Sequence, residues 1–248
     1  MRYRATLAYD GTAYQGFQRQ ASGIPSIQAA VEQAIANVSG QQVTVSGAGR
    51  TDTGVHASGQ VIAFDVEWAH KDHDLLRALN ARLPQDIALQ DIRQQPGFHP
   101  RYDALSRLYR YRVLVAVQRQ PLLRERVWQL RQSVDSELME QAANLFLGEK
   151  DFGALGKPTQ GEVTIRTVFQ SEWAAQQTEF GTLMTYTVEA NGFLQHMVRR
   201  MVAMLVQVGQ NRIPLERFEE LLNRAQLVEG LPIAPPQGLT LEVVRYNE

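Results

Sequence analysis

Residues 47–57, with the sequence GAGRTDTGVHA, combine three glycines with a single carboxylate, Asp52. Glycine lets another backbone or a ligand come close. Asp52 is the one side chain in this stretch that is a strong candidate for a nucleophile or a proton base. Arg50 lies two residues before it, a spacing that allows an ion pair keeping the carboxylate ionised. The stretch therefore predicts a closely approached loop that carries one reactive carboxylate.

The segments on either side of this stretch, residues 42–45 and 60–64, have the pattern of strands, and loops between strands often carry catalytic groups. Three other interpretations remain open. A glycine-containing connection is usually only a turn. The pair Gly47 and Gly49 resembles a phosphate-binding loop, but no helix and no lysine follow. The run Asp52-Thr53-Gly54 matches the short signature of aspartic proteases, which needs a second carboxylate.

Composition excludes several classes of chemistry. The chain has 248 residues, 44% of them hydrophobic, and no cysteine. Disulfides, thiolate catalysis and cysteine-based zinc sites are therefore excluded. The nearest histidines, His70 and His73, lie in a charged run that favours a solvated helix start over a metal site. No apolar run is long enough to span a membrane, and the first residues alternate like a strand, so we expect a cytoplasmic protein without metal or membrane.

Charge is distributed unevenly along the chain. The net charge is -1, yet residues 101–131 contain eight arginines against two acidic residues. Tyr102, Tyr109, Tyr111 and Trp128 are interleaved with these arginines. Guanidinium groups suit phosphates and aromatic faces suit unstacked bases, so this pattern indicates RNA, although a solvated face remains an alternative.

The first 100 residues show the order β-α-β-β-α-β. Strands are predicted at 2–10, 42–45, 60–64 and 87–92, and helices at 27–39, after an N-cap at Ser26, and at 72–83. This order is typical of a ferredoxin-like fold. The loop at 9–20, rich in aromatic, amide and glycine residues, is predicted to face a ligand, with a packed surface loop as the alternative.

The remaining residues repeat this order with one extra helix. Strands are predicted at 106–117, 164–173, 182–190 and 239–246, and helices at 193–208, at 215–223 and from an N-cap at Ser133 to Gly148. The prediction is an α+β protein of two ferredoxin-like halves, residues 1–100 and 101–248. Their antiparallel sheets are expected side by side with a cleft between them.

Four blocks of sequence together carry a resemblance to a known family. They are YDGTxYxGFQxQ from Tyr9, GAGRTDxGVHA from Gly47, RxYxY from Arg107 and NGFLxxMVR from Asn191. In this order, over nearly the whole chain, they resemble the tRNA pseudouridine synthase A family. Two departures, Pro100 and the run from Asp151 to Leu155, lie outside the blocks and concern the local fit to RNA.

The resemblance implies a homodimeric isomerase that converts uridine to pseudouridine at positions 38–40 of the tRNA anticodon arm without a cofactor. It implies that Asp52 is the catalytic aspartate, acting as nucleophile or base. It further implies that Arg50 helps to extrude and hold the nucleotide, that Tyr109 packs on the uracil, and that Arg199 pairs with Asp52. A non-catalytic RNA-binding protein is the main alternative; a pure binder would gain nothing from a carboxylate facing phosphate.

Overall fold

The chain combines helices with strands that pair mainly antiparallel, which confirms the predicted α+β class. The computed structural model describes residues 1–21, 23–158, 161–224 and 226–247. Two compact units are present: unit 1 comprises Met1–Leu105 with Thr240–Glu248, and unit 2 comprises Ser106–Leu239. The last strand therefore groups with the first unit, whereas the sequence-based halves follow the order of the chain.

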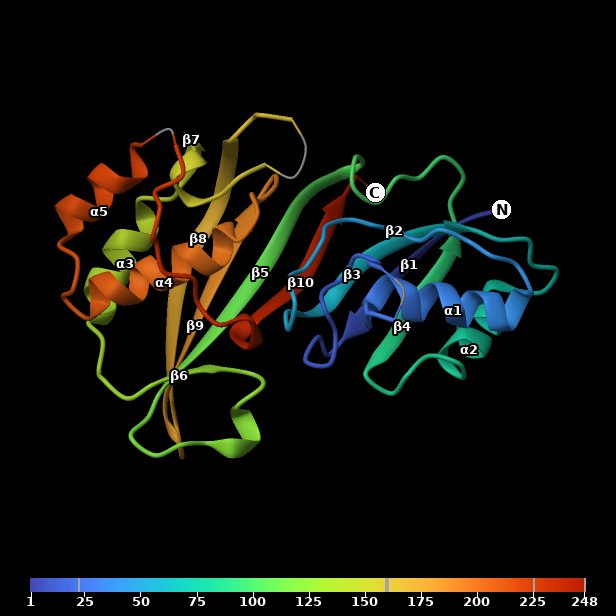
Figure 1. The fold of residues 1–248 in the computed structure, drawn as a ribbon, viewed down its shortest axis with the longest axis horizontal. Helices are drawn as coiled ribbons and strands as arrows, with labels where there is room; N and C mark the ends of the chain where they lie inside the picture. Colours follow the sequence, from blue (N-terminus) through green and yellow to red (C-terminus); the bar gives the residue numbers. More distant parts are fainter. Residues whose placement is uncertain (22, 159–160, 225, 248) are drawn as a thin grey trace. The chain divides into compact units, whose positions relative to one another are not determined.

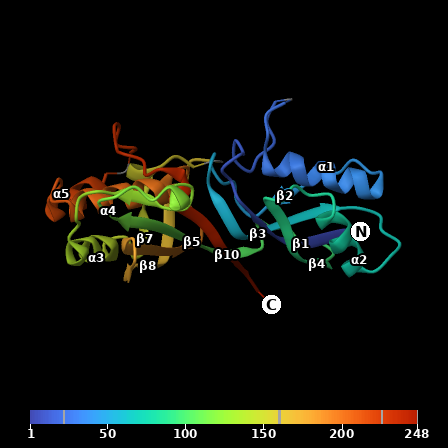
Figure 2. The same ribbon diagram turned by 90° about the horizontal axis from the view of Figure 1, so that it is seen from below.

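Unit 1 is an antiparallel sheet with two helices that pack against each other (Figure 1, Figure 2). Strand β1 lies between β4 and β3, and β2 pairs with the other edge of β3, as in a ferredoxin-like fold. β10 adds a short parallel pair to β3 at His56 and Ala57. The elements are β1 (Arg2–Tyr9), α1 (Ile27–Ser39), β2 (Ser46–Gly47), β3 (His56–Asp65), α2 (Asp72–Asn80), β4 (Ile87–Gln94) and β10 (Leu239–Tyr246).

Helix α1 has the ends that its sequence predicts. The Ser26 hydroxyl accepts a hydrogen bond from the Ala29 amide at 3.4 Å, and Gly40 ends the helix with a φ of 71°. Ile27, Val31 and Ile35 are buried at the spacing of one helical face. Local capping and an apolar stripe thus account for this helix.

The predicted strand at 42–45 is wrong, because β2 contains only Ser46 and Gly47. The Val45 amide donates to Glu32 Oε1 at 3.0 Å, and Gln28 Nε2 donates to the Val45 carbonyl at 3.0 Å. Both side chains come from α1. The backbone amide and carbonyl of Val45 therefore form hydrogen bonds with side chains of a helix and do not pair with a neighbouring strand.

Unit 2 has the strand order β5-β9-β8-β7, all antiparallel, and α3, α4 and α5 pack together (Figure 1). The short strand β6 pairs with β5 in parallel, as β10 does with β3. These two pairs differ from the prediction that the sheets are antiparallel. The elements are β5 (Ala104–Val115), β6 (Trp128–Leu130), α3 (Ser136–Asn144), β7 (Gly148–Asp151), β8 (Ile165–Thr178), β9 (Gly181–Ala190), α4 (Met197–Gly209) and α5 (Leu215–Leu222), with single-turn helices η1 (Pro121–Leu123), η2 (Gly153–Leu155) and η3 (Pro236–Gly238).

Two helix starts in unit 2 differ from prediction. The N-cap of α3 is Asp135, whose carboxylate accepts from the Glu137 and Leu138 amides at 3.0 Å, so the prediction of Ser133 is wrong. Helix α4 begins at Met197 rather than at residue 193, because His196 has a left-handed φ of 62°. The strands β6 and β7 were not predicted, since each is too short to show a period.

Candidate active site

The loop that carries Asp52 lies between two strands, as predicted, although the strand before it is β2 and not residues 42–45. Its first part is fixed to β3, because the Ala48 amide donates to the Val61 carbonyl at 2.8 Å and Gln60 Nε2 donates to the Gly49 carbonyl at 2.8 Å. The Val55 amide donates to the Asp52 carbonyl at 3.1 Å and closes a turn. The backbone of Asp52 is thus held in a hydrogen-bonded turn, and its side chain is half-buried.

The loop after β1 clamps this turn from another side. The Phe17 amide donates to the Thr51 carbonyl at 3.1 Å, and the Gly54 amide donates to the Tyr14 carbonyl at 3.4 Å. A third bond runs from the Gly11 amide to His56 Nδ1 at 3.1 Å. Thr51, directly before Asp52, and Gly54, two residues after it, are therefore anchored to one neighbouring loop.

Glycine is required where these two loops meet. A Cβ added to Gly11 would lie 2.0 Å from the Val55 carbonyl oxygen, a distance that no side chain tolerates. A Cβ added to Gly16, which has a φ of +85°, would lie 2.7 Å from the Thr51 carbonyl oxygen. These glycines belong to the Tyr9 sequence block. They explain why that block and the Asp52 block occur together.

Tyr9 supports the loop from the core. Its hydroxyl lies 2.7 Å from Thr51 Oγ1, next in sequence to Asp52, and it is buried. Burial raises the pKa of Tyr9 to about 12, which the hydrogen bond with Thr51 partly offsets. The phenol is therefore protonated at neutral pH and acts as a neutral hydrogen-bonding group.

The prediction that the loop at 9–20 faces a ligand is wrong for its aromatic residues. Tyr14 is 7% exposed and Phe17 is 2% exposed. The Tyr14 hydroxyl donates to Asp86 at 2.7 Å, and the Phe17 ring fills the space where a Cβ of Gly47 would lie. These side chains are packing groups that support the Asp52 loop.

Arg50 is exposed on the same loop. Within the part of the chain that the structure describes, it makes no hydrogen bond or ion pair, so the Arg50–Asp52 pair that the spacing allowed is absent. Its guanidinium group is consequently available to an anion from solvent.

Tyr109 and Arg199 belong to unit 2. Tyr109 lies on β5, is 8% exposed, and packs edge-to-face on Phe193 with ring centres 5.2 Å apart. Arg199 lies on α4, and its Nε donates to the Ala234 carbonyl at 2.8 Å. Beside this bond the Tyr111 hydroxyl donates to the Pro235 carbonyl at 2.7 Å. The pairing of Arg199 with Asp52, and a place for Tyr109 on the substrate, stay predictions.

The segment at Ala234 and Pro235 was not predicted as part of this region. It holds Arg199 and Tyr111 by backbone carbonyls, which carry no sequence signal. Burial raises the pKa of Tyr111 overall, and the charge of Arg199 lowers it by a smaller amount. Both side chains are therefore fixed by contacts that only the fold reveals.

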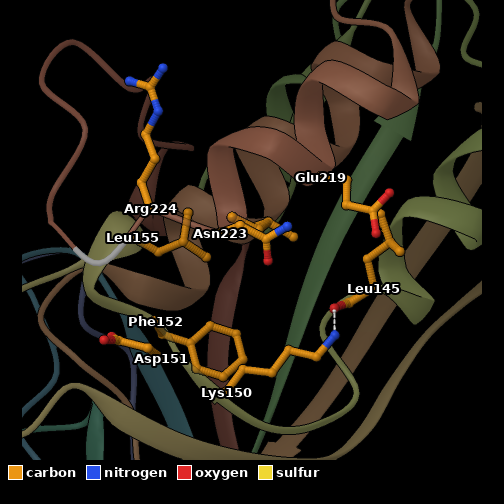
Figure 3. Close-up of a pocket in the computed structure, with 9 residues that line it drawn as sticks. Leu145, Lys150, Asp151, Phe152, Leu155, Glu219, Asn223 and Arg224 are labelled. Atoms are coloured by element: carbon orange, nitrogen blue, oxygen red, sulfur yellow. Dashed lines mark hydrogen bonds between the residues drawn. The ribbon is translucent and has the colours of Figure 1, made fainter.

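Unit 2 also contains a cavity of about 310 Å³ between the end of α3, β7 and α5 (Figure 3). Across its wall Lys150 Nζ donates to the Leu145 carbonyl at 2.5 Å. None of the predicted site residues lines it. The lining residues are Leu145, Lys150, Asp151, Phe152, Leu155, Glu219, Leu222, Asn223 and Arg224.

Metal-ligating side chains do not gather anywhere in residues 1–21, 23–158, 161–224 and 226–247 in a group of three or more. Of the histidine pair singled out above, His73 lies 3.0 Å from Asp74 and His70 packs on Trp68. Among the described helices, none has the length and apolarity to cross a membrane.

The chain matches the family model described as tRNA pseudouridine synthase over residues 5–103 and 142–247. It is 39% identical to a tRNA pseudouridine synthase A of Neisseria gonorrhoeae, over 99% of this chain and 92% of the relative. It is 38% identical to that of Methylacidiphilum infernorum (98% and 95% covered) and 37% identical to that of Streptococcus pneumoniae (100% and 99% covered).

A solved archaeal box H/ACA sRNP Nop10-Cbf5 complex matches with a TM-score of 0.35 and 11% identity, over 83% of this chain and 44% of that one. This similarity is too low to bear on function. The sequence relatives are full-length and closer, and they define the class: the protein is an isomerase that forms pseudouridine in tRNA. The chain belongs to the tRNA pseudouridine synthase A family, as the four sequence blocks predicted.

Proposed function

We propose that this protein isomerises uridine to pseudouridine at positions 38–40 of the tRNA anticodon stem-loop, with Asp52 as the catalytic carboxylate and without a cofactor. The proposal rests on one observation above all. Asp52 lies on a turn, and residues on both sides of it are held by backbone hydrogen bonds. The backbone position from which the carboxylate extends is therefore fixed. Catalysis of a bond-breaking step requires that the reactive group be held in the right position.

The reaction has two requirements of the protein. The target uridine must leave its stack, which costs a few kcal/mol, and a carboxylate must then attack the nucleotide or remove a proton from it. Asp52 supplies the carboxylate in either role. The isomerisation rejoins the same base to the same ribose through carbon 5, so it consumes no second substrate.

Arg50 is proposed to hold the backbone of the extruded nucleotide. Its exposure, and the absence of any partner for it in the part of unit 1 that the structure describes, leave its guanidinium group available to a phosphate. Tyr109 is proposed to pack on the uracil, and Arg199 to pair with Asp52. For Arg199, the hydrogen bond from its Nε to Ala234 fixes one edge of the guanidinium group.

We further propose that the protein works as a cytoplasmic homodimer on free tRNA. The main alternative is a protein that binds RNA without chemistry. Light scattering on a gel-filtration column tests the dimer, and the reaction itself tests the alternative.

The test measures pseudouridine formed on an unmodified tRNA transcript that carries uridines at 38–40, in the presence of EDTA. Wild type is compared with Asp52→Asn, which removes the ionised carboxylate but little volume. Asp74→Asn on α2, where the side chain is 41% exposed, makes the same chemical change as a control. Wild type and control should form product, whereas Asp52→Asn should bind tRNA but form none.

Each failure has its own meaning. Full activity of Asp52→Asn would end the proposed role of the carboxylate. Product at other uridines only would refute the assignment to positions 38–40. Loss of product in EDTA that Mg²⁺ restores, on a transcript shown to stay folded, would contradict the expectation that no metal takes part.

A further inference from the structure

The connection between β5 and β6, residues 117–127, exposes an apolar side chain almost completely. Leu122 is 95% exposed at the centre of η1, and Val117 is 75% exposed at the start of the connection. Figure 1 shows this segment, here called the 117–127 loop, extending past the start of β6. The leucine side chain keeps its apolar surface in water, and covering that surface on binding would be favourable.

The loop is held in one conformation by a small core of its own. Leu114, Ala116 and Val127 are buried together, and Leu123 and Leu183 pack against them. Leu123 therefore points inward while its neighbour Leu122 points outward. The Val127 amide donates to the Leu123 carbonyl at 3.1 Å and closes the loop behind η1.

Gln129 completes the frame with three hydrogen bonds to backbone groups. Its Nε2 donates to the Ala116 and Gln118 carbonyls at 2.9 and 2.6 Å, and its Oε1 accepts from the Gln120 amide at 3.1 Å. The exposure of Leu122 thus belongs to an organised loop, and the side chain is presented in a defined place.

Positive charge surrounds this leucine. Residues 117–131 contain four arginines and one glutamate, within a protein of net charge -1. Arg124 is paired with Glu125 at 3.0 Å, and both Arg119 and Arg131 are exposed. These two arginines make no hydrogen bond or ion pair with any residue that the structure describes.

The composition favours RNA over protein as the partner. Residues 117–131 carry four arginines against one glutamate, and this local excess of positive charge complements the phosphates of RNA. Arginines bind phosphates, and apolar side chains such as leucine insert between bases in complexes with the DNA minor groove. An unstacked base or a ribose offers an apolar face on which the exposed Leu122 side chain can pack.

We propose that the 117–127 loop is a second RNA-docking element, in which arginines contact phosphates and Leu122 packs on an unstacked base or ribose. The proposal rests on the proposed function, since it takes tRNA as the RNA. It assigns the loop to binding and leaves the chemistry to Asp52.

The experiment measures tRNA affinity by filter binding at several salt concentrations, and single-turnover pseudouridine formation at saturating enzyme. Leu122→Asp should weaken binding at least tenfold and leave the saturated rate within twofold of wild type. Leu122→Met should bind within twofold. Gln141→Glu adds the same charge at an exposed position of α3 and should change nothing.

The arginines are tested by the salt dependence of binding. Arg119→Gln and Arg124→Gln should each lower the slope of log affinity against log salt by about 0.7 to 0.9 if each contacts one phosphate. Wild-type affinity of Leu122→Asp, with unchanged slopes for both arginine variants, would overturn the proposal. Wild-type affinity combined with a changed oligomeric state by sedimentation would assign Leu122 to a second copy of the chain and overturn it as well.

This result can be separated from the fate of the proposed function. If wild type formed no pseudouridine but bound tRNA through Leu122, the function would fail and the docking element would stand. If product formed normally and Leu122→Asp bound normally, only the docking element would fail.

Discussion

The two loops that matter most, residues 47–57 in unit 1 and 117–127 in unit 2, are kept in place by different means. The Asp52 loop is clamped by main-chain hydrogen bonds, at a contact so close that Gly11 and Gly16 have no room for a side chain. The 117–127 loop is held by a small apolar core and by one amide side chain, Gln129. Backbone hydrogen bonds to a neighbouring loop are thus the main constraint on the first loop, and packed side chains are the main constraint on the second.

The difference teaches what each loop has to do. A reacting carboxylate tolerates little displacement, because a misplacement of about 1 Å costs catalysis on the order of a hundredfold. A docking loop adjusts to its partner, and interface side chains commonly change conformation on binding. Mutations in the first loop should thus affect the reaction, and mutations in the second should affect affinity.

The largest effect is expected for Gly11→Ala. The added methyl group would lie 2.0 Å from the Val55 carbonyl oxygen, so the two loops must separate. Stability should fall by about 2 kcal/mol or more, and single-turnover pseudouridine formation by roughly a hundredfold. Gly49→Ala is the control, because nothing lies within 4 Å of the methyl group it would add. Urea unfolding measures the first effect; equal behaviour of the two variants would refute the clamp.

The next effect concerns alkaline stability. Burial raises the pKa of Tyr9 to about 12 from 10.0, so folded protein retains a proton that unfolded chain releases. The stabilisation from this group is fully present below pH 10 and is lost as pH rises through 12. The difference between the two pKa values corresponds to a free energy of unfolding on the order of 3 kcal/mol. Tyr9→Phe should therefore lose less stability than wild type between pH 9 and 12, as urea unfolding across that range would show; parallel curves would contradict the shift.

At neutral pH, Tyr9→Phe distinguishes an effect on the reaction from an effect on stability alone. It removes a buried hydroxyl bonded to Thr51 at 2.7 Å, at a cost of about 1 kcal/mol. Tyr186→Phe removes an equally buried hydroxyl, bonded to Ser171 at 2.7 Å in unit 2. Thermal unfolding should show similar losses of stability for both. Only Tyr9→Phe should slow the saturated reaction, and an equal slowing in both would break the comparison.

The smallest effect is expected for Gln129→Ala, which removes three hydrogen bonds from the frame of the 117–127 loop. The freed loop must be ordered again on binding, so tRNA affinity should fall about threefold at an unchanged saturated rate. Gln120→Ala is the control, because only the backbone of Gln120 takes part in that frame. Filter binding measures both variants. A slower saturated rate in Gln129→Ala would contradict the division of roles.

Sequence reasoning succeeded where the signal is local. The stripe of Ile27, Val31 and Ile35 with its two caps predicted α1 to the residue. The loop around Asp52 was predicted from its glycines and flanking segments. It failed at residues 42–45, where two side chains of α1 take the hydrogen bonds of Val45, and at Ser133, where a nearby aspartate is the cap.

By itself the sequence determined the α+β class, the order of the longer helices and strands, the family and the loop that holds Asp52. These follow from periodicity, from capping residues and from blocks of residue types, all of which are properties of the chain in order. Only the tertiary structure decided that Gly11 and Gly16 meet the Asp52 loop, and that Tyr14 and Phe17 support it from within.

The tertiary structure also decided that the last strand groups with unit 1, and that Leu122 is exposed while Leu123 is partly buried. The physical reason is the same in each case. Main-chain hydrogen bonds and close backbone contacts between distant segments use groups that every residue carries. Residue types therefore do not predict these contacts, which are seen only when the fold brings the segments together.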